Sequence, residues 1–219
     1  MAPVITVLVT ALLLGAFLLG SIPFGFLLYR LATGGDIRRI GSGNIGATNV
    51  LRSGGRRLGA LTLALDAGKG ALAVAAALYW APPVAPWAAL VVIVGHMYSP
   101  WLSFHGGKGV ATALGAFAVL TPWALLAAAV VFALVFAGWR YVSLASIAAC
   151  VTLPLVVLIP ALGPPGGHAT PALQATGEVA VATALLIIAR HRANLARLWR
   201  GTESGWGRAP GGNSRGVAK

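Results

Sequence analysis

The feature that most constrains the fold is a run of 30 residues, 110–139, that contains no charged side chain. A single helix over this run would measure about 45 Å, whereas the hydrocarbon core of a bilayer is about 30 Å thick. The sequence "TPW" at 121–123 offers a break, because proline is pre-set for the start of a helix. We therefore expect a hairpin of two short membrane helices, 110–121 and 122–138.

The composition extends this argument to the whole chain. Hydrophobic residues make up 58% of the 219 residues and charged residues only 9%, against about 25% in an ordinary soluble domain. Lipid cannot satisfy backbone hydrogen bonds, so the apolar segments should be helices, and we predict an all-α integral membrane protein. The predicted spans, some of them short, number about seven: 4–29, 59–80, 87–101, 110–121, 122–138, 143–161 and 172–190. Pro23 predicts a kink in the first of them.

The charge distribution predicts the orientation of these spans. The net charge is +12, from 16 Lys and Arg against 4 Asp and Glu. With seven crossings every basic residue falls on one side, as expected for cytoplasmic loops, so the charge indicates topology rather than binding to nucleic acid. We expect the N-terminus outside and the C-terminus in the cytoplasm. The first span lacks the basic region of a signal peptide and is expected to be retained. One polytopic domain, 1–203, and a disordered tail, 204–219, are predicted.

A glycine-rich loop, "GSGNIGATNVLR" at 41–52, lies on the basic side. Glycines permit positive φ and close backbone approach, so that successive N–H groups can converge on an anion, and arginine adds a bidentate fork for phosphate. The alternative is a flexible loop whose arginines meet anionic lipid headgroups. The candidate residues here are Ser42 and Arg52, with Gly41, Gly43, Asn44, Thr48 and Asn49 as phosphate ligands.

Two further polar segments share this side. In "HGGKGVAT" the glycines Gly106, Gly107 and Gly109 surround Lys108 just before an expected helix start, which favours an anion. The alternative is a plain turn with a positive-inside lysine. In "RHRANLARLWRGTE" the side chains of His191 and Asn194 share a helix face, or the segment is simply a basic interfacial helix. His96, at the inner end of a span, is interpreted as structural support.

The residues that are missing restrict the chemistry. The four acids are not paired at metal or glycosidase spacing, and the four histidines are not arranged as zinc ligands. The single cysteine, Cys150, excludes an intrachain disulfide. We therefore expect no metal and no cofactor. A site of cations and hydrogen-bond donors can bind two anions and stabilise charge, leaving the reaction to an activated substrate.

Five stretches together resemble a known family: "GSIPFG", "GSGNIGATNVLR", "LTLALDAGKG", "GHMYSPWLSFHGGKGVAT" and "RHRANLARLWRGTE". They are similar to the signature loops of the bacterial acyl-phosphate-dependent glycerol-3-phosphate acyltransferases, the PlsY family, over about residues 20–203. The resemblance implies transfer of a fatty acyl group from acyl phosphate to the 1-hydroxyl of glycerol 3-phosphate, giving lysophosphatidic acid and phosphate. It also implies a seven-span inner-membrane protein with a cytoplasmic site. No obligate protein partner is evident from the sequence.

The resemblance also implies roles for individual residues. The family's important serine and arginine fall on Ser42 and Arg52, and its phosphate-binding lysine falls on Lys108, in the loop associated with glycerol 3-phosphate. Its histidine and asparagine fall on His191 and Asn194, and a structural glutamate falls on Glu203. The chain departs from the family at His105, where Lys or Arg is frequent, and at Trp101, where Phe is frequent.

Three questions stay open at this point. The proton of the attacking hydroxyl goes either to a substrate phosphate or to His191, whose ordinary pKa is near neutral. A transporter of a phosphorylated metabolite would use similar cations, although no inverted repeat is visible in the sequence. If the protein were a scaffold held to anionic lipid, substitution of any basic residue would weaken membrane binding to a similar extent. If it is an enzyme, its activity should depend most on Lys108 and Arg52.

Overall fold

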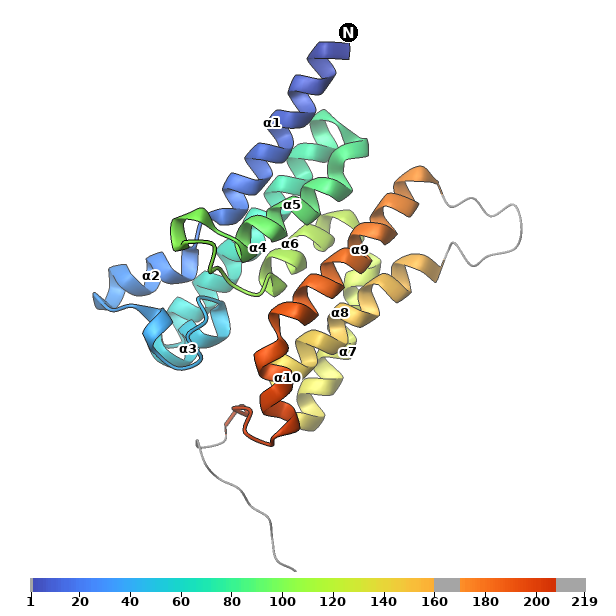
Figure 1. Ribbon diagram of the computed structural model, residues 1–219. Coiled ribbons are helices and arrows are strands. Elements are labelled where there is room, and N and C mark those ends of the chain that lie inside the picture. Colours follow the sequence, from blue (N-terminus) through green and yellow to red (C-terminus); the bar gives the residue numbers. More distant parts are fainter. Residues whose placement is uncertain (1, 160–169, 208–219) are drawn as a thin grey trace, which may run out of the picture.

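A computed structural model describes residues 2–159 and 170–207, and these ranges contain helices, turns and no strand, as predicted (Figure 1). The α-helices are α1 (Ala2–Ser21), α2 (Phe24–Thr33), α3 (Ala47–Gly54), α4 (Arg56–Trp80), α5 (Ala85–Met97), α6 (Val110–Leu120), α7 (Pro122–Trp139), α8 (Val142–Leu158), α9 (Pro171–Arg190) and α10 (Arg192–Trp199). Three short 3₁₀ turns are η1 (Ile37–Arg39), η2 (Pro82–Val84) and η3 (Pro100–Leu102).

Among the described residues, 5 helical stretches are long and apolar enough to cross a membrane. They contain α1, α4, α5, α7 and α9, respectively. Two further apolar helices are shorter, α6 with 11 residues and α8 with 17. At about 1.5 Å per residue, α6 alone would reach only about half of the way across a hydrocarbon core.

Both interruptions of the long apolar runs lie beside a proline, one as the predicted break and one where only a kink was predicted. The uncharged run is divided at Thr121 between α6 and α7, which confirms the predicted break. At Pro23 the chain does more than kink, because α1 ends at Ser21 and α2 begins as a separate helix. Other boundaries differ from the prediction: α4 begins at Arg56 rather than 59, α5 ends at Met97 rather than 101, and the segment between the first two predicted spans contains the short helix α3. Expectations about 160–169 and 208–219 lie outside the described residues.

Small residues let the helices approach closely. Helix α4 packs against α6, and α1 packs against α5. A Cβ added at Gly70 or Gly115 would collide with the backbone of the opposite helix, and the same holds at Gly20 and Gly95. Association in lipid depends on such close packing, since lipid tails are as apolar as the side chains.

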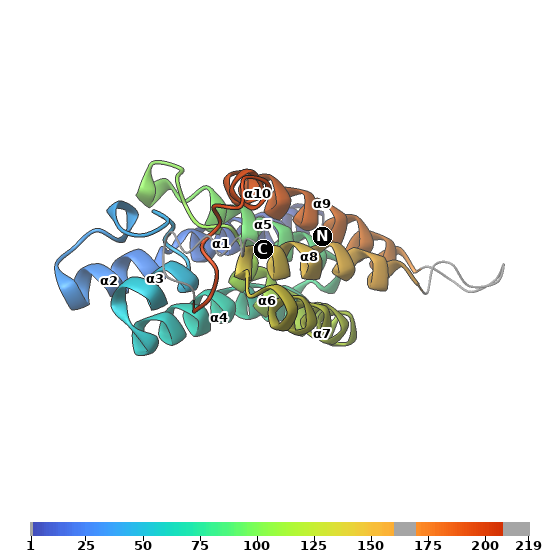
Figure 2. The ribbon, with the colours of Figure 1, turned by 90° about the horizontal axis from the view of Figure 1, so that it is seen from below.

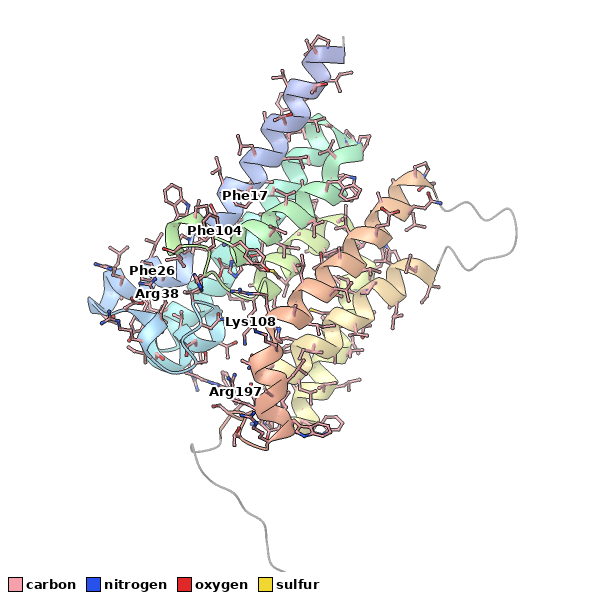
Figure 3. The ribbon with its side chains drawn as sticks, in the orientation of Figure 1. Phe17, Phe26, Arg38, Phe104, Lys108 and Arg197 are labelled. Carbon is pink, nitrogen blue, oxygen red and sulfur yellow. The ribbon has the colours of Figure 1, made fainter. Side chains whose placement is uncertain are left out.

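The polar loops gather at the end of the molecule opposite the N-terminus. Arg38, Lys108 and Arg197 all lie toward this end in Figure 3. Seen from there, α2 and α3 stand on one side and α7, α8 and α9 on the other (Figure 2). Residues expected in a disordered tail are held here, since the Trp206 amide donates to the Arg140 carbonyl over 2.8 Å. This end of the helical bundle is therefore where the candidate site should lie.

We predict that Gly115→Ala destabilises the bundle, because the new Cβ would collide with the Ala67 carbonyl on α4. Overpacking of this kind should lower the thermal midpoint of the purified protein by about 4–8 °C. The matched control is Gly68→Ala, since no atom lies within 4 Å of a Cβ at that position. Equal midpoints for the two variants would contradict the packing described here.

Candidate functional site

Lys108 lies where the loop after η3 meets the first turn of α6. Its Nζ donates a hydrogen bond to Asn194 Oδ1 on α10 over 2.5 Å. Gly109 has φ +84°, a conformation natural to glycine, and forms the N-cap of α6. The N–H groups of Lys108 and Gly109 have no partner among the described residues. A cation and free amides thus stand together at a helix N-terminus, as an anion requires.

Several positive charges act on Lys108. Its pKa is lowered to about 8, first by burial, and the charges of Arg197, Arg190 and Arg52 lower it further against the opposing effect of Glu203. The predicted pair Arg52 and Lys108 is therefore brought into one electrostatic field. Repulsion between like charges and the desolvation cost of burial both disfavour the ammonium form of Lys108. A bound anion from outside the protein would offset both costs.

Glu203 connects the parts of this cluster. One carboxylate oxygen, Oε1, accepts hydrogen bonds from Ser143 Oγ and Asn194 Nδ2, each over 2.6 Å. The other, Oε2, accepts from Arg197 Nε over 2.7 Å. Burial favours the neutral acid, but these three bonds outweigh it and hold the pKa of Glu203 below its ordinary value. Glu203 is thus an ionised brace that orients Asn194 toward Lys108.

The glycine-rich loop before α3 is closed by Asn49. Its Nδ2 donates to the carbonyls of Ile37, Ile40 and Asn44, and its Oδ1 accepts from the Ser42 amide over 3.0 Å. The side chain is 4% exposed, and its amide has no donor left for a phosphate. The expectation that Asn49 is a phosphate ligand is therefore corrected, because this side chain holds the loop together.

The other predicted residues of this loop are more accessible. Gly41 and Gly43 have positive φ, and the Asn44 side chain accepts from the Gly46 amide. Ser42 is exposed and Thr48 is partly exposed. No hydrogen bond in the described part of the chain joins Ser42 to Lys108. Arg52 donates to the Ser204 carbonyl over 3.1 Å, which links α3 to the segment after α10.

The loop Gly106–Gly109 is fixed on two sides. The amides of Gly106 and Gly107 donate to the carbonyls of Met97 and His96, over 3.0 and 3.1 Å. Their own carbonyls accept from the guanidinium of Arg190, over 2.7 and 3.1 Å. The sequence predicts that all three glycines bind phosphate, but the N–H groups of Gly106 and Gly107 already donate within the protein, which corrects the prediction for these two. Arg190 is not among the predicted site residues, although it begins one of the three polar segments.

The imidazole of His191 is oriented so that Nδ1 donates a hydrogen bond and Nε2 can accept one. Its Nδ1 lies 2.8 Å from the Ile187 carbonyl, and a carbonyl can only accept, so Nδ1 carries the proton and Nε2 has a free lone pair. Burial and the charge of Lys108 lower the pKa of His191 to about 4. The near-neutral pKa expected from the sequence is therefore wrong. At pH 7 the imidazole is neutral and a weak base.

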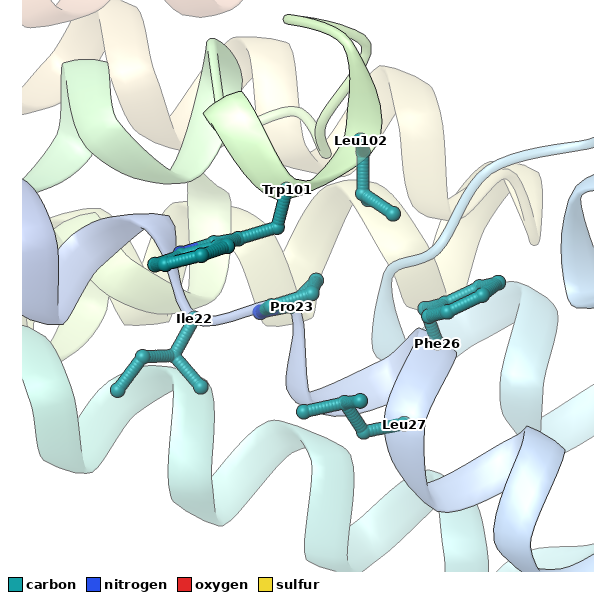
Figure 4. Close-up of a pocket in the computed structure, with 6 residues that line it drawn as sticks. All are labelled: Ile22, Pro23, Phe26, Leu27, Trp101 and Leu102. Atoms are coloured by element: carbon teal, nitrogen blue, oxygen red, sulfur yellow. The ribbon is translucent and has the colours of Figure 1, made fainter.

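An apolar hollow of about 290 Å³ lies at the break between α1 and α2 (Figure 4). It is lined by Ile22, Pro23, Phe26, Leu27, Trp101 and Leu102. Cations stand at its edge, with the guanidinium of Arg38 4.9 Å and that of Arg30 5.9 Å from the centre of the Phe26 ring. Trp101 and Leu102 begin the segment that leads to Lys108. Arg38 is paired with the Asp36 carboxylate over 2.6 Å, so the hollow combines apolar walls with an ion pair and the cation of Arg30.

These features define a class of protein: an integral membrane protein with a cluster of cations and free amides, suited to an anion, at one end of a helical bundle. Across residues 2–159 and 170–207 no group of three or more His, Cys, Asp or Glu side chains could hold a metal ion. The family model for glycerol-3-phosphate acyltransferase matches residues 10–201. The chain belongs to this family.

Individual relatives agree with this assignment. A glycerol-3-phosphate acyltransferase of Trichlorobacter lovleyi is 48% identical over 87% of this chain and 93% of its own, and one of Mesorhizobium japonicum is 46% identical over 90% and 94%. The chain is also similar to a crystal structure of PlsY (YgiH), an integral membrane glycerol 3-phosphate acyltransferase, in its glycerol 3-phosphate form. That similarity has a TM-score of 0.81 and 38% identity, over 91% of this chain and 96% of the other. The lysophosphatidic acid form gives a TM-score of 0.79.

We predict that Glu203→Ala loosens the site, because Asn194 and Arg197 lose a buried charged acceptor. Hydrogen bonds to charged groups contribute about 1.5–3 kcal/mol, so the thermal midpoint should fall by about 6 °C. Glu178→Ala is the matched control, since this acid is exposed on α9. A midpoint that falls no more for Glu203→Ala than for Glu178→Ala would refute the bracing role.

Proposed function

We propose that this protein transfers a fatty acyl group from acyl phosphate to the 1-hydroxyl of sn-glycerol 3-phosphate, releasing 1-acyl-glycerol 3-phosphate (lysophosphatidic acid) and phosphate. Family membership supports the reaction. The observation that carries the site is the contact of Lys108 with Asn194 at the start of α6, inside the field of three arginines. Both substrates carry a phosphate group, and a cationic end with free amides is suited to bind two of them.

Binding would be divided between the loops. Lys108 and the amides at the start of α6 would hold the phosphate of glycerol 3-phosphate, in line with the family resemblance. Arg52 and the hydroxyl of Ser42 would hold the phosphate of the donor, since the amides of Ser42, Gly43 and Gly46 already donate within the glycine-rich loop. Asn194 would orient Lys108. Holding both substrates in one geometry removes much of the entropic cost of a two-substrate reaction.

The reaction then needs a destination for one proton. The 1-hydroxyl oxygen attacks the acyl carbonyl, the new ester bond forms, and the bond from the acyl carbon to the phosphate oxygen breaks as phosphate leaves with the electron pair. With a pKa of about 4, His191 is a weaker base than a phosphate monoester, whose second pKa is about 6. We therefore assign the proton to a substrate phosphate. The free Nε2 of His191 would accept a hydrogen bond from the hydroxyl and orient it.

The membrane arrangement is part of the proposal. Seven apolar helices, α1 and α4 to α9, would each cross or enter the bilayer, and the short helix α6 would pair with α7. The positive-inside rule then places the site end and the C-terminus in the cytoplasm of a bacterium and the N-terminus outside the inner membrane. Glycerol 3-phosphate would reach the site from water, and the acyl donor would reach it from the lipid.

The Lys108→Ala variant tests the site directly. Loss of one positioned donor typically costs about 10²–10³ in rate, so kcat/KM for glycerol 3-phosphate should fall by about 100-fold or more. Arg200→Ala, at an exposed arginine after α10, should stay within about twofold, because isolated surface charges contribute little. Equal losses in both variants would favour non-specific attraction of anions. The elution profile in detergent checks that both variants are folded.

The pKa of Lys108 predicts a pH dependence. The ammonium is lost as the pH rises through about 8, whereas a phosphate monoester stays a dianion over the same range. The dissociation constant for glycerol 3-phosphate, measured by calorimetry, should therefore rise between about pH 8 and 10. Lys108→Arg keeps its charge and should flatten this profile. A wild-type affinity that is constant over this range would contradict the assignment.

The apolar hollow is our candidate for the acyl chain of the donor, because it adjoins the segment leading to Lys108 and has cations at its rim. Filling it with Leu27→Trp should lower kcat/KM for long-chain acyl phosphates by about 10-fold and affect short chains less. The matched control is Leu31→Trp, one helical turn away, at a residue that is 83% exposed and does not line the hollow. An unchanged chain-length profile for Leu27→Trp would exclude this location.

A further inference from the structure

A cluster of ionisable side chains lies inside the bundle, and the mechanism above does not use it. Asp66 and Lys69 come from α4 and His96 from the last turn of α5, and each residue is at most 3% exposed. The ammonium of Lys69 lies 2.8 Å from Asp66 Oδ1 and 2.9 Å from His96 Nδ1. It also donates to the Ile22 carbonyl over 2.9 Å, at the break between α1 and α2. Burying charged side chains within a membrane costs free energy, so ionisable residues found there usually have a function.

The ammonium of Lys69 determines the state of the histidine. An ammonium group can only donate, and this one donates to the Ile22 carbonyl and lies 2.9 Å from His96 Nδ1, while Asp66 Oδ1 forms an ion pair with it. Nδ1 therefore accepts, and the imidazole carries its proton on Nε2. The cluster fixes both the tautomer and the orientation of the ring, as a hydrogen-bond partner on one ring nitrogen generally does.

The oriented ring lies against the phosphate loop. A Cβ added at Gly107 would collide with His96 Nε2, and the next nearest atoms also belong to this ring. The Gly107 amide donates to the His96 carbonyl, so both the backbone and the side chain of His96 contact one loop residue. Gly106 differs, because a Cβ there would collide with the His96 carbonyl instead of the ring. Arg190 holds the carbonyls of the same two glycines.

We propose that His96 is a positioning residue for the loop Gly106–Gly109, and that Asp66 and Lys69 act through His96 to set the place of Lys108. This inference rests on the proposed function, because it assigns the loop to glycerol 3-phosphate. It implies that damage to the cluster weakens binding of glycerol 3-phosphate and leaves binding of the acyl donor unchanged. A cluster that only joins α4 to α5 would affect stability and neither substrate.

The first test separates the two substrates. Lys69→Met removes the ammonium and keeps most of the side chain's length. Since small misplacements of a positioned group have large effects, KM for glycerol 3-phosphate should rise by about 10-fold, with KM for acyl phosphate within about twofold. The matched control is Thr62→Val, at another fully buried polar residue of α4, which should leave both KM values within about twofold. A lower thermal midpoint with both KM values unchanged in Lys69→Met would overturn the proposal.

The second test does not depend on whether Lys69→Met folds. Gly107→Ala should raise the dissociation constant for glycerol 3-phosphate, measured by calorimetry, by about 10-fold. In a His96→Ala background the obstructing ring is absent, so the additional effect of Gly107→Ala should shrink by about threefold or more. Gly106→Ala should have the same effect in both backgrounds, because its obstacle is backbone.

Additive effects for Gly107 and His96 would show that the ring does not set the loop. The proposed function fails by a different result, namely a folded wild-type protein that gives no lysophosphatidic acid from the two substrates. Turnover by the wild type together with additive effects would reject the positioning role alone.

Discussion

The structure of the site depends on the contact between the Lys108 ammonium and the Asn194 amide. It joins the start of α6 to α10, which are far apart in the sequence. Asn194 in turn donates to Glu203, and the same carboxylate accepts from Ser143 at the start of α8. In this series of hydrogen bonds each group orients the one before it. The Lys108 ammonium is therefore held partly buried near other cations without forming a direct ion pair with the Glu203 carboxylate. The resulting positive field remains available for an anion, which we propose is the phosphate of a substrate.

The membrane explains why these groups stand at one end. Helix packing in lipid relies on small residues such as Gly70 and Gly115, and polar groups are costly at depth. The loops at the end of the bundle can instead combine backbone amides, water access and charge. The helix breaks at Pro23 and Thr121 serve the same arrangement, the first by bordering an apolar hollow and the second by returning the chain to the site end.

Much of this could be predicted from the sequence because it depends on local chemistry. Proline positions predicted the break at Thr121 and a kink at Pro23, where the chain in fact breaks into two helices, and glycines beside Lys108 and Arg52 indicated the loops that we propose bind anions. The rest depends on partners distant in the chain. The role of Asn49 as a buried brace requires the carbonyls of Ile37 and Ile40, and the low pKa of His191 requires burial beside Lys108. The spacing of residues in the sequence predicts neither of these contacts. It also does not predict that the Arg190 guanidinium donates hydrogen bonds to the carbonyls of Gly106 and Gly107.

The central claim is that a site of cations, amides and one weakly basic histidine performs acyl transfer with a substrate phosphate as proton acceptor. The most direct measurement uses the purified protein in lipid with acyl phosphate and glycerol 3-phosphate, without metal or acyl-CoA. Phosphate and lysophosphatidic acid should appear in a one-to-one ratio. Phosphate release without lysophosphatidic acid, or no turnover by a folded sample given several chain lengths, would contradict the account.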